Sequence, residues 1–160
     1  MTLALIAGQG RLPGLIYENH PEPPVVAALE GAALDTLTPQ ISFTLETFGT
    51  LLKALADRGV KELCFVGAVT RPIFDPTKLD EATLPLVPKL AEGLSKGDDN
   101  ALRAILRVCE DAGFRIRAAQ ELLPGLVVAE GVLGKVQPSE AHASEAARAE
   151  ALHHAIGSAD

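Results

Sequence analysis

Aromatic and basic residues are both scarce in this chain of 160 residues, which holds no tryptophan, one tyrosine and five phenylalanines. So few aromatic side chains argue against a platform on which the bases of a single-stranded nucleic acid would stack. Lysine and arginine number 14 against 21 aspartates and glutamates, which gives a net charge of −7. Because nucleic-acid binding depends on neutralising phosphates, we expect no nucleic-acid partner.

Long hydrophobic runs are absent as well. The longest are Val25–Leu29, Leu63–Val69 and Leu126–Ala129. None approaches the roughly 20 apolar residues that cross a bilayer. No basic residue precedes the apolar run Leu3–Ala7, so we expect no signal peptide. The only two cysteines, Cys64 and Cys109, lie in apolar stretches, as expected of core residues in a reducing compartment. The sequence therefore predicts a cytoplasmic protein without a transmembrane segment.

Short apolar runs alternate with helical patterns along most of the chain. Strands are predicted at Leu3–Ala7, Val25–Leu29, Ile41–Leu45, Glu62–Val66, Phe114–Ala118 and Leu126–Ala129. Helices are predicted after Pro13, at Phe48–Arg58 with Thr47 as its N-cap, and at about Leu86–Leu94. This alternation predicts an α/β fold, a Rossmann-like three-layer domain with a mainly parallel sheet.

The clearest helical pattern begins at Asp98 or Asp99 and ends before Gly113. Its apolar face is predicted to consist of Ala101, Leu102, Ile105, Leu106 and Cys109. The stretch Asp75–Pro88, which comes before it, holds three prolines and is expected to form a loop or lid.

The first candidate site follows the first predicted strand. Gly8 and Gly10 lie between that strand and a helix, where glycines let the backbone approach a phosphate. A dinucleotide fingerprint would have its third glycine where Pro13 stands, and Glu30 lies where that fingerprint has its ribose-binding acid. Binding of NAD stays open as an alternative, and so does a purely structural tight turn.

Two further stretches combine charge with loop geometry. Gly67–Pro72 follows another buried strand, so it projects from the same edge of a parallel sheet, and its Arg71 is suited to bind a phosphate. Lys96, Asp98 and Asp99 stand at the start of a helix, where the carboxylates suit Mg²⁺ and the lysine suits a phosphate. A structural turn and a helix cap explain the same residues, and both alternatives stay open.

The end of the chain has a different pattern. Ser139–Ile156 predicts one helix in which Leu152 and Ile156 are the only large apolar residues. Such a helix has little to bury by itself. We expect it to pack on another chain or to belong to a unit whose remainder lies outside this chain.

Short motifs in a fixed order connect these stretches to a known family. They are Leu5–Pro13, Phe48-Gly49-x-x-x-Lys53-x-Leu55, Phe65-x-Gly67-x-Val69-x-Arg71-Pro72, Lys96-Gly97-Asp98-Asp99-x-x-x-Arg103, Ala119–Pro124, Gly134-Lys135 and Pro138-Ser139. In this order and spacing they resemble the LpxI-type UDP-2,3-diacylglucosamine pyrophosphatases of Gram-negative lipid A biosynthesis. The resemblance covers essentially the whole chain.

The resemblance implies two domains and hydrolase chemistry. Enzymes of this family have a Rossmann-like N-terminal domain and a C-terminal domain of comparable size, with the lipid-linked substrate between them. They hydrolyse UDP-2,3-diacylglucosamine to 2,3-diacylglucosamine 1-phosphate and UMP with Mg²⁺, by attack of water on the α-phosphate. Their essential aspartate lies in the C-terminal domain. By this resemblance, residues 1–134 form the N-terminal domain, and residues 135–160 form a linker and the first helix of a truncated C-terminal domain.

The resemblance also implies a binding role for the loops of this domain. The residues concerned are Gly8, Gln9, Gly10, Leu12, Pro13, Gly67, Val69, Arg71, Lys96, Gly97, Asp98 and Asp99. Arg71 and Lys96 would offset phosphate charge. Asp98 or Asp99 would touch sugar hydroxyls or Mg²⁺, whose site the missing domain would complete.

The resulting expectation is a cytoplasmic domain that binds the lipid-linked UDP-sugar or its sugar phosphate product and does not hydrolyse it alone. Association with the inner membrane and into a homo-oligomer are left open. The alternative is a non-catalytic module that binds a nucleotide or another small ligand.

Overall fold

The computed structural model describes residues 2–70, 72, 74–94, 98–128, 131–132 and 134–157, with the backbone alone at residues 92–94, 98 and 99. The chain divides into two units, Met1–Leu126 and Val127–Asp160, which are described separately. The first unit contains a sheet with its covering helices, and the second contains the helix α6 (Glu140–Gly157). The domain boundary expected at residue 134 stays a prediction.

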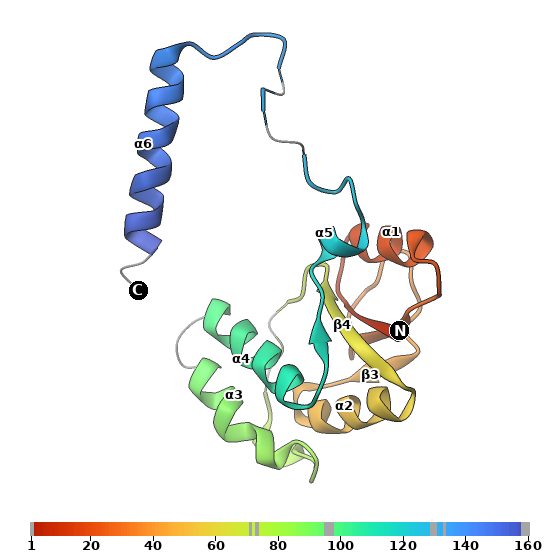
Figure 1. The fold of residues 1–160 in the computed structure, drawn as a ribbon. Helices are drawn as coiled ribbons and strands as arrows, with labels where there is room; N and C mark the ends of the chain where they lie inside the picture. The colour runs from red at the N-terminus through yellow and green to blue at the C-terminus, as the bar shows by residue number, and fades with distance from the viewer. Residues whose placement is uncertain are drawn as a thin grey trace. The chain divides into compact units, whose positions relative to one another are not determined.

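A parallel sheet organises the first unit (Figure 1). Its strands are β1 (Thr2–Ala7), β2 (Val25–Leu29), β3 (Ile41–Phe43), β4 (Val60–Val66) and β5 (Arg115–Ile116). They lie in the order β3-β2-β1-β4-β5, and every neighbouring pair is parallel. The chain therefore passes from the central strand β1 outward to one side, and then returns to the other side of β1 with β4. This order confirms the predicted Rossmann-like α/β fold.

Successive residues of the central strands supply two hydrophobic cores, one on each face of the sheet. On one face, Leu3, Leu5 and Cys64 pack with α1 (Leu12–Asn19) and α5 (Ala119–Leu122). On the other face, Ala4, Ile6 and neighbouring strands pack with α2 (Phe48–Asp57), α3 (Val87–Leu94) and α4 (Asp98–Asp111). The unit thus has the three predicted layers of helix, sheet and helix.

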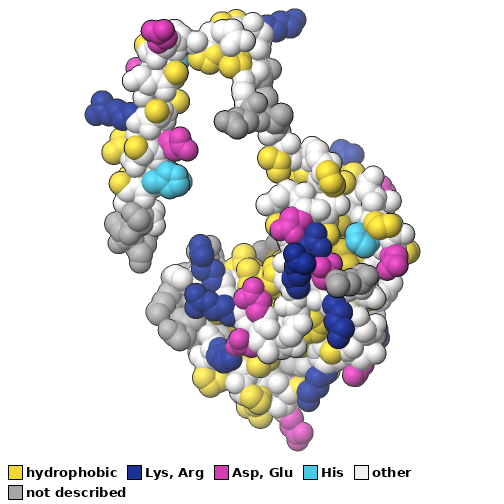
Figure 2. Space-filling view, viewed as in Figure 1, with side chains coloured by type: hydrophobic (Ala, Val, Ile, Leu, Met, Phe, Trp, Pro, Cys, Tyr) yellow, Lys and Arg dark blue, Asp and Glu magenta, His cyan; other side chains and the backbone are white. Residues whose placement is uncertain are grey.

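Two ion pairs made by Arg117 connect the short helix α5 to the sheet. Arg117 Nη1 lies 3.0 Å from Glu62 Oε1 on β4, and Arg117 Nε lies 2.5 Å from Glu121 Oε2 on α5. On the face of the molecule seen in Figure 2, basic and acidic side chains are intermixed. Acidic side chains therefore lie beside basic ones on this face.

The start of α2 differs from its predicted capping. The strand predicted at Ile41–Leu45 ends at Phe43, and Leu45–Thr47 forms a short 3₁₀ helix, η1. Thr47 precedes α2 as predicted, but its hydroxyl oxygen accepts the N–H of Thr44 at 3.0 Å and caps no N–H of the helix. The hydroxyl satisfies the preceding turn because η1 brings Thr44 within its reach.

One predicted strand is wrong, and the predicted apolar face of α4 is confirmed at Ile105 and Cys109 but wrong at Leu102. No strand forms at residues 126–128 of the predicted strand Leu126–Ala129, and Val127 and Val128 are about two-thirds exposed. An apolar run makes a strand only where a neighbouring strand offers backbone partners. On α4, Leu102 is 45% exposed, whereas Val108, which was left out of the predicted apolar face, is only 1% exposed.

The helix predicted at Ser139–Ile156 is confirmed as α6 (Glu140–Gly157), and none of its residues is buried. Leu152 and Ile156 are 55% and 70% exposed. Among the helices in the described part of the chain, none combines the length and apolar character needed to cross a membrane.

Leucine-to-alanine substitutions in the two units should differ strongly in their effect on the free energy of unfolding. Leu55 on α2 is fully buried, so Leu55→Ala removes packed atoms and leaves a cavity that costs about 2–5 kcal/mol of unfolding free energy. Leu152→Ala on α6 should cost less than about 0.5 kcal/mol. Urea unfolding followed by circular dichroism measures both values. Similar losses for the two variants would contradict the assignment of the core.

Candidate functional site at the carboxyl edge of the sheet

Two glycine-containing loops meet where the strand order reverses. β1 ends at Ala7 and β4 ends at Val66, and these two residues are register partners in neighbouring parallel strands. The loops that follow, residues 8–11 and 67–70, therefore leave the same edge of the sheet. In open α/β sheets, this switch point is where ligands bind.

The two loops are joined directly through their backbones. Gln9 N–H donates to Ala68 O at 2.7 Å, and Ala68 N–H donates to Gln9 O at 2.9 Å. Gly8 N–H donates to Val66 O at 2.8 Å. These three N–H groups are therefore used within the protein and are not available to a phosphate.

Glycine is required at two positions of this contact. A Cβ on Gly8 would lie 2.3 Å from Ala68 O, and one on Gly67 would lie 2.7 Å from Gln9 O. Gly67 also has a φ of +94°, in the region that favours glycine. These glycines were predicted to let a ligand approach the backbone. In the structure, they are needed because the backbones of the two loops lie so close to each other.

The remaining part of the first loop is covered by a carboxylate that the sequence had not singled out. Gly10 N–H donates to Oδ2 of Asp35 at 2.8 Å, and Asp35 is exposed in the connection between β2 and β3. Gln9 and Gly10 are exposed, Leu12 is half-buried and Pro13 is buried. Asp35 follows β2 at the same sheet edge, but nothing in its sequence neighbourhood indicated a partner 25 residues away.

The side chains of the charged residues in the predicted site are not among those that the structure describes. Arg71, Lys96 and Gly97 are not among the described residues, and Asp98 and Asp99 are described only as the backbone that begins α4. Their binding roles stay predictions. Within the described residues, no three His, Cys, Asp or Glu side chains gather as metal ligands, and binding of Mg²⁺ stays a prediction.

A large apolar cavity of about 600 Å³ opens beside the two loops. Gly67 and the exposed Val69 contribute to its wall, together with residues of β1, β4, α2 and α4. Four of the chain's five phenylalanines line it, namely Phe43, Phe48, Phe65 and Phe74. In the sequence, Phe43 and Phe65 lie in predicted strands, whereas Phe48 and Phe74 lie outside them, so only the fold brings the four together.

The predicted loop or lid is held against the start of α2. Asp75 N–H donates to the carboxylate of Glu46 at 2.6 Å, and the backbone N–H of Asp80 donates to Glu46 O at 3.1 Å. The hydroxyl of the buried Thr83 accepts Gly49 N–H at 2.8 Å. Gly49 is needed here because a Cβ would lie 2.2 Å from Ala82 O. The segment at residues 75–83 is thus held against α2, and Phe74, just before it, lines the cavity.

The two cysteines take no part in the site. Burial raises the pKa of the Cys64 thiol to about 11 and that of Cys109 to about 12. Both thiols are therefore protonated at neutral pH and unsuited to act as nucleophiles. This confirms the prediction that both are core residues.

A pair of glycine substitutions tests the contact between the loops. Gly113 has a φ of +92°, nearly that of Gly67, but a Cβ there meets nothing within 4 Å. Gly113→Ala should therefore cost about 1–2 kcal/mol from backbone strain alone. Gly67→Ala should cost a further 1–3 kcal/mol, roughly, from the clash with Gln9 and Gly8. Equal losses in urea unfolding would show that the loops do not need this close approach.

The Glu46 anchor predicts a pH dependence of stability. The N–H of Asp75 holds the pKa of the Glu46 carboxyl below its usual value of 4.5. A lowered folded-state pKa stabilises the fold above pH 4.5, and this contribution is lost as pH falls through the folded pKa. The stability difference between wild type and Glu46→Gln should therefore be largest near neutral pH and shrink below pH 4.5. Urea unfolding at each pH measures this difference in unfolding free energy. A difference that does not change with pH would show that the charge of Glu46 does not stabilise the fold.

Two comparisons with known proteins agree with this architecture. A family model described as the LpxI N-terminal domain matches residues 2–126. The UDP-2,3-diacylglucosamine pyrophosphatase LpxI of Caulobacter vibrioides is 34% identical to this chain over 164 residues. The match takes in 99% of this chain and 58% of that relative, so the chain spans little more than half of the relative's length. Since the family match extends over the whole sheet and its helices, the chain belongs to the LpxI family, with residues 2–126 as its N-terminal domain.

Proposed function

We propose that this chain forms the substrate-binding half of a UDP-2,3-diacylglucosamine pyrophosphatase. Membership of the LpxI family supports the proposal, as does the activity named for the Caulobacter relative. The proposed ligand is a UDP-linked sugar with two acyl chains, or the acylated sugar phosphate that its hydrolysis leaves. The proposal concerns the residues of this chain, which match 58% of the length of the Caulobacter relative.

The observation that carries this proposal is the pairing of a polar rim with an apolar cavity at one sheet edge. Gln9 and Thr70, which have polar side chains, are exposed on the loops, while the adjoining cavity of about 600 Å³ is lined mostly by apolar side chains. A phosphorylated sugar needs hydrogen-bond partners, and an acyl chain needs apolar walls. A ligand with both parts fits this combination better than a free nucleotide does.

Charged residues of the predicted site would complete the polar side. We infer that Arg71 and Lys96 offset phosphate charge and that Asp98 or Asp99 binds sugar hydroxyls. Mg²⁺ would supply Lewis-acid chemistry in the complete enzyme. The described residues offer no metal cluster, so its ligands are proposed to come from outside them. The role of this chain is to bind and orient the ligand.

Binding and hydrolysis should therefore separate in this chain. By calorimetry, we expect the 160-residue chain to bind 2,3-diacylglucosamine 1-phosphate at least about tenfold more tightly than glucosamine 1-phosphate, because the acyl chains bury apolar area. We expect no release of UMP from UDP-2,3-diacylglucosamine, with or without Mg²⁺. Mg²⁺-dependent release of UMP would overturn the proposal that this chain binds the ligand without hydrolysing it.

The same measurements test the rival functions. Tight binding of UMP or NAD without binding of the acylated sugar phosphate would favour a nucleotide-binding module instead. Arg71→Ala should weaken binding of the sugar phosphate about tenfold or more, since a charge-assisted contact to phosphate is lost. Association with a membrane and into a homo-oligomer, and a cytoplasmic location, stay predictions.

A further inference from the structure

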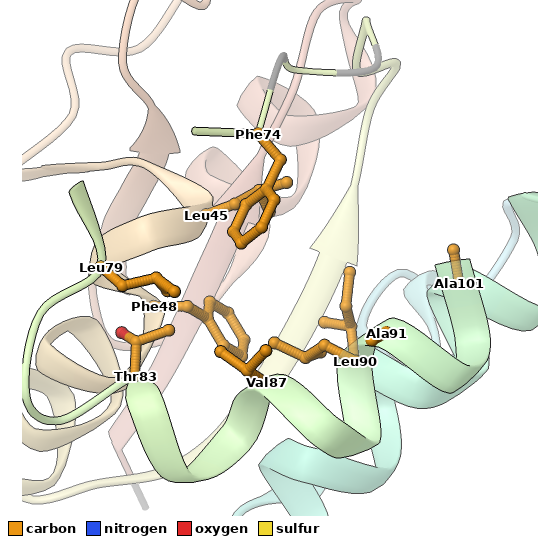
Figure 3. A pocket seen from close by; sticks show the side chains of 10 residues that line it. Leu45, Phe48, Phe74, Leu79, Thr83, Val87, Leu90, Ala91 and Ala101 are labelled. Atoms are coloured by element: carbon orange, nitrogen blue, oxygen red, sulfur yellow. The ribbon is translucent and has the colours of Figure 1, made fainter. Parts of the chain in front are cut away.

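A second, smaller pocket lies beside the large cavity (Figure 3). Its volume is about 60 Å³. It shares five wall residues with the large cavity, namely Leu45, Phe48, Phe74, Ala101 and Ile105. The residues that belong to the small pocket alone are Leu79, Thr83, Val87, Leu90 and Ala91. The small pocket thus adjoins the cavity at the glycine loops, and α3 and the segment before it supply its own walls.

The described wall of the small pocket is almost wholly apolar. Among the described residues of its wall, Thr83 alone has a polar side chain, and its hydroxyl accepts the N–H of Gly49. In Figure 3 the oxygen of Thr83 lies on the side away from Phe48, and its methyl carbon lies toward the ring. An apolar wall of this kind favours a hydrocarbon occupant, because the occupant removes apolar surface from water. The pocket's volume is well below the roughly 150 Å³ that holds a benzene ring, so it suits a chain end and no ring.

The walls of the small pocket have little freedom to move. Leu79 and Thr83 belong to the segment that Glu46 and Gly49 hold by hydrogen bonds. Leu90 on α3 packs against the main hydrophobic core. A pocket with fixed walls limits how far a chain can enter, since an over-long chain must overpack it.

We propose that this small pocket receives the end of one acyl chain, and that Val87, Leu90 and Ala91 on α3 set the chain length that this domain accepts. The inference rests on the proposed function, because it requires a ligand whose polar part lies at the glycine loops. It adds a specificity determinant to that function. While the pocket fills, each added CH₂ group tightens binding about fourfold. Beyond the pocket's depth, further groups give no gain.

Straight-chain fatty acids of about eight to about sixteen carbons serve as probes, since they carry the chain without the sugar phosphate. Calorimetry on the full chain should show the dissociation constant falling about fourfold per CH₂ group up to an optimal length, and no further. Affinity that rises steadily through the whole series would overturn the proposal, because it would mean that no wall stops the chain.

Two variants with opposite effects test the wall itself. Ala91→Leu narrows the pocket and should shorten the optimal chain by about two CH₂ groups, whereas Leu90→Ala widens it and should lengthen the optimum by a similar amount. If Leu90→Ala fails to fold, Ala91→Leu still decides the question. Ala56→Leu on α2 is the matched control, since Ala56 is exposed and is not among the wall residues of either cavity. An unchanged optimum in both pocket variants would overturn the proposal.

These outcomes differ from failure of the proposed function. If 2,3-diacylglucosamine 1-phosphate binds but the pocket variants leave the optimum unchanged, the function stands and the chain-length inference falls. If the pocket variants shift the optimal fatty-acid length but the acylated sugar phosphate does not bind, the pocket limits chain length and the proposed function falls.

Discussion

The candidate site depends on one close approach, that of the backbones after β1 and β4. Gly8 and Gly67 let these loops share hydrogen bonds with no side chain between them. The approach fixes the loops at the switch point of the sheet and sets the position of the cavity rim beside them. It also uses up N–H groups that would otherwise serve a phosphate. The polar contacts of a ligand must then come from other groups at this edge.

A second constraint, at the start of α2, holds the segment that follows Phe74, a wall residue of the large cavity. Gly49 is the point where the segment at residues 74–86 rests on α2, because only a glycine leaves room for Ala82. Thr83 and Glu46 then hold that segment through backbone N–H groups. The stretch predicted to be a loop or lid is held against α2 and forms a wall of the small pocket. The phenylalanines, few in number, are concentrated between this wall and the sheet.

Most of the architecture was predictable because it is encoded locally. The apolar runs at Leu3–Ala7 and Val25–Leu29 end at turns, and the alternation with helices leaves little choice but a parallel sheet. The partners of Gly10 and Gly49 were not predictable, since Asp35 and Thr83 lie 25 and 34 residues away. Pairing also explains the wrong strand at residues 126–128, because an apolar run carries no information on whether a neighbouring strand is present.

The edge strands of the sheet have a consequence for aggregation in a crowded solution. β3 and β5 form its two edges, and they pair over only three and two residues. The long strands β1 and β4 lie inside, so their backbone groups face each other and their neighbours. Because an exposed, extended edge is the template on which another chain adds as a strand, such short edges protect the domain against sheet-mediated aggregation.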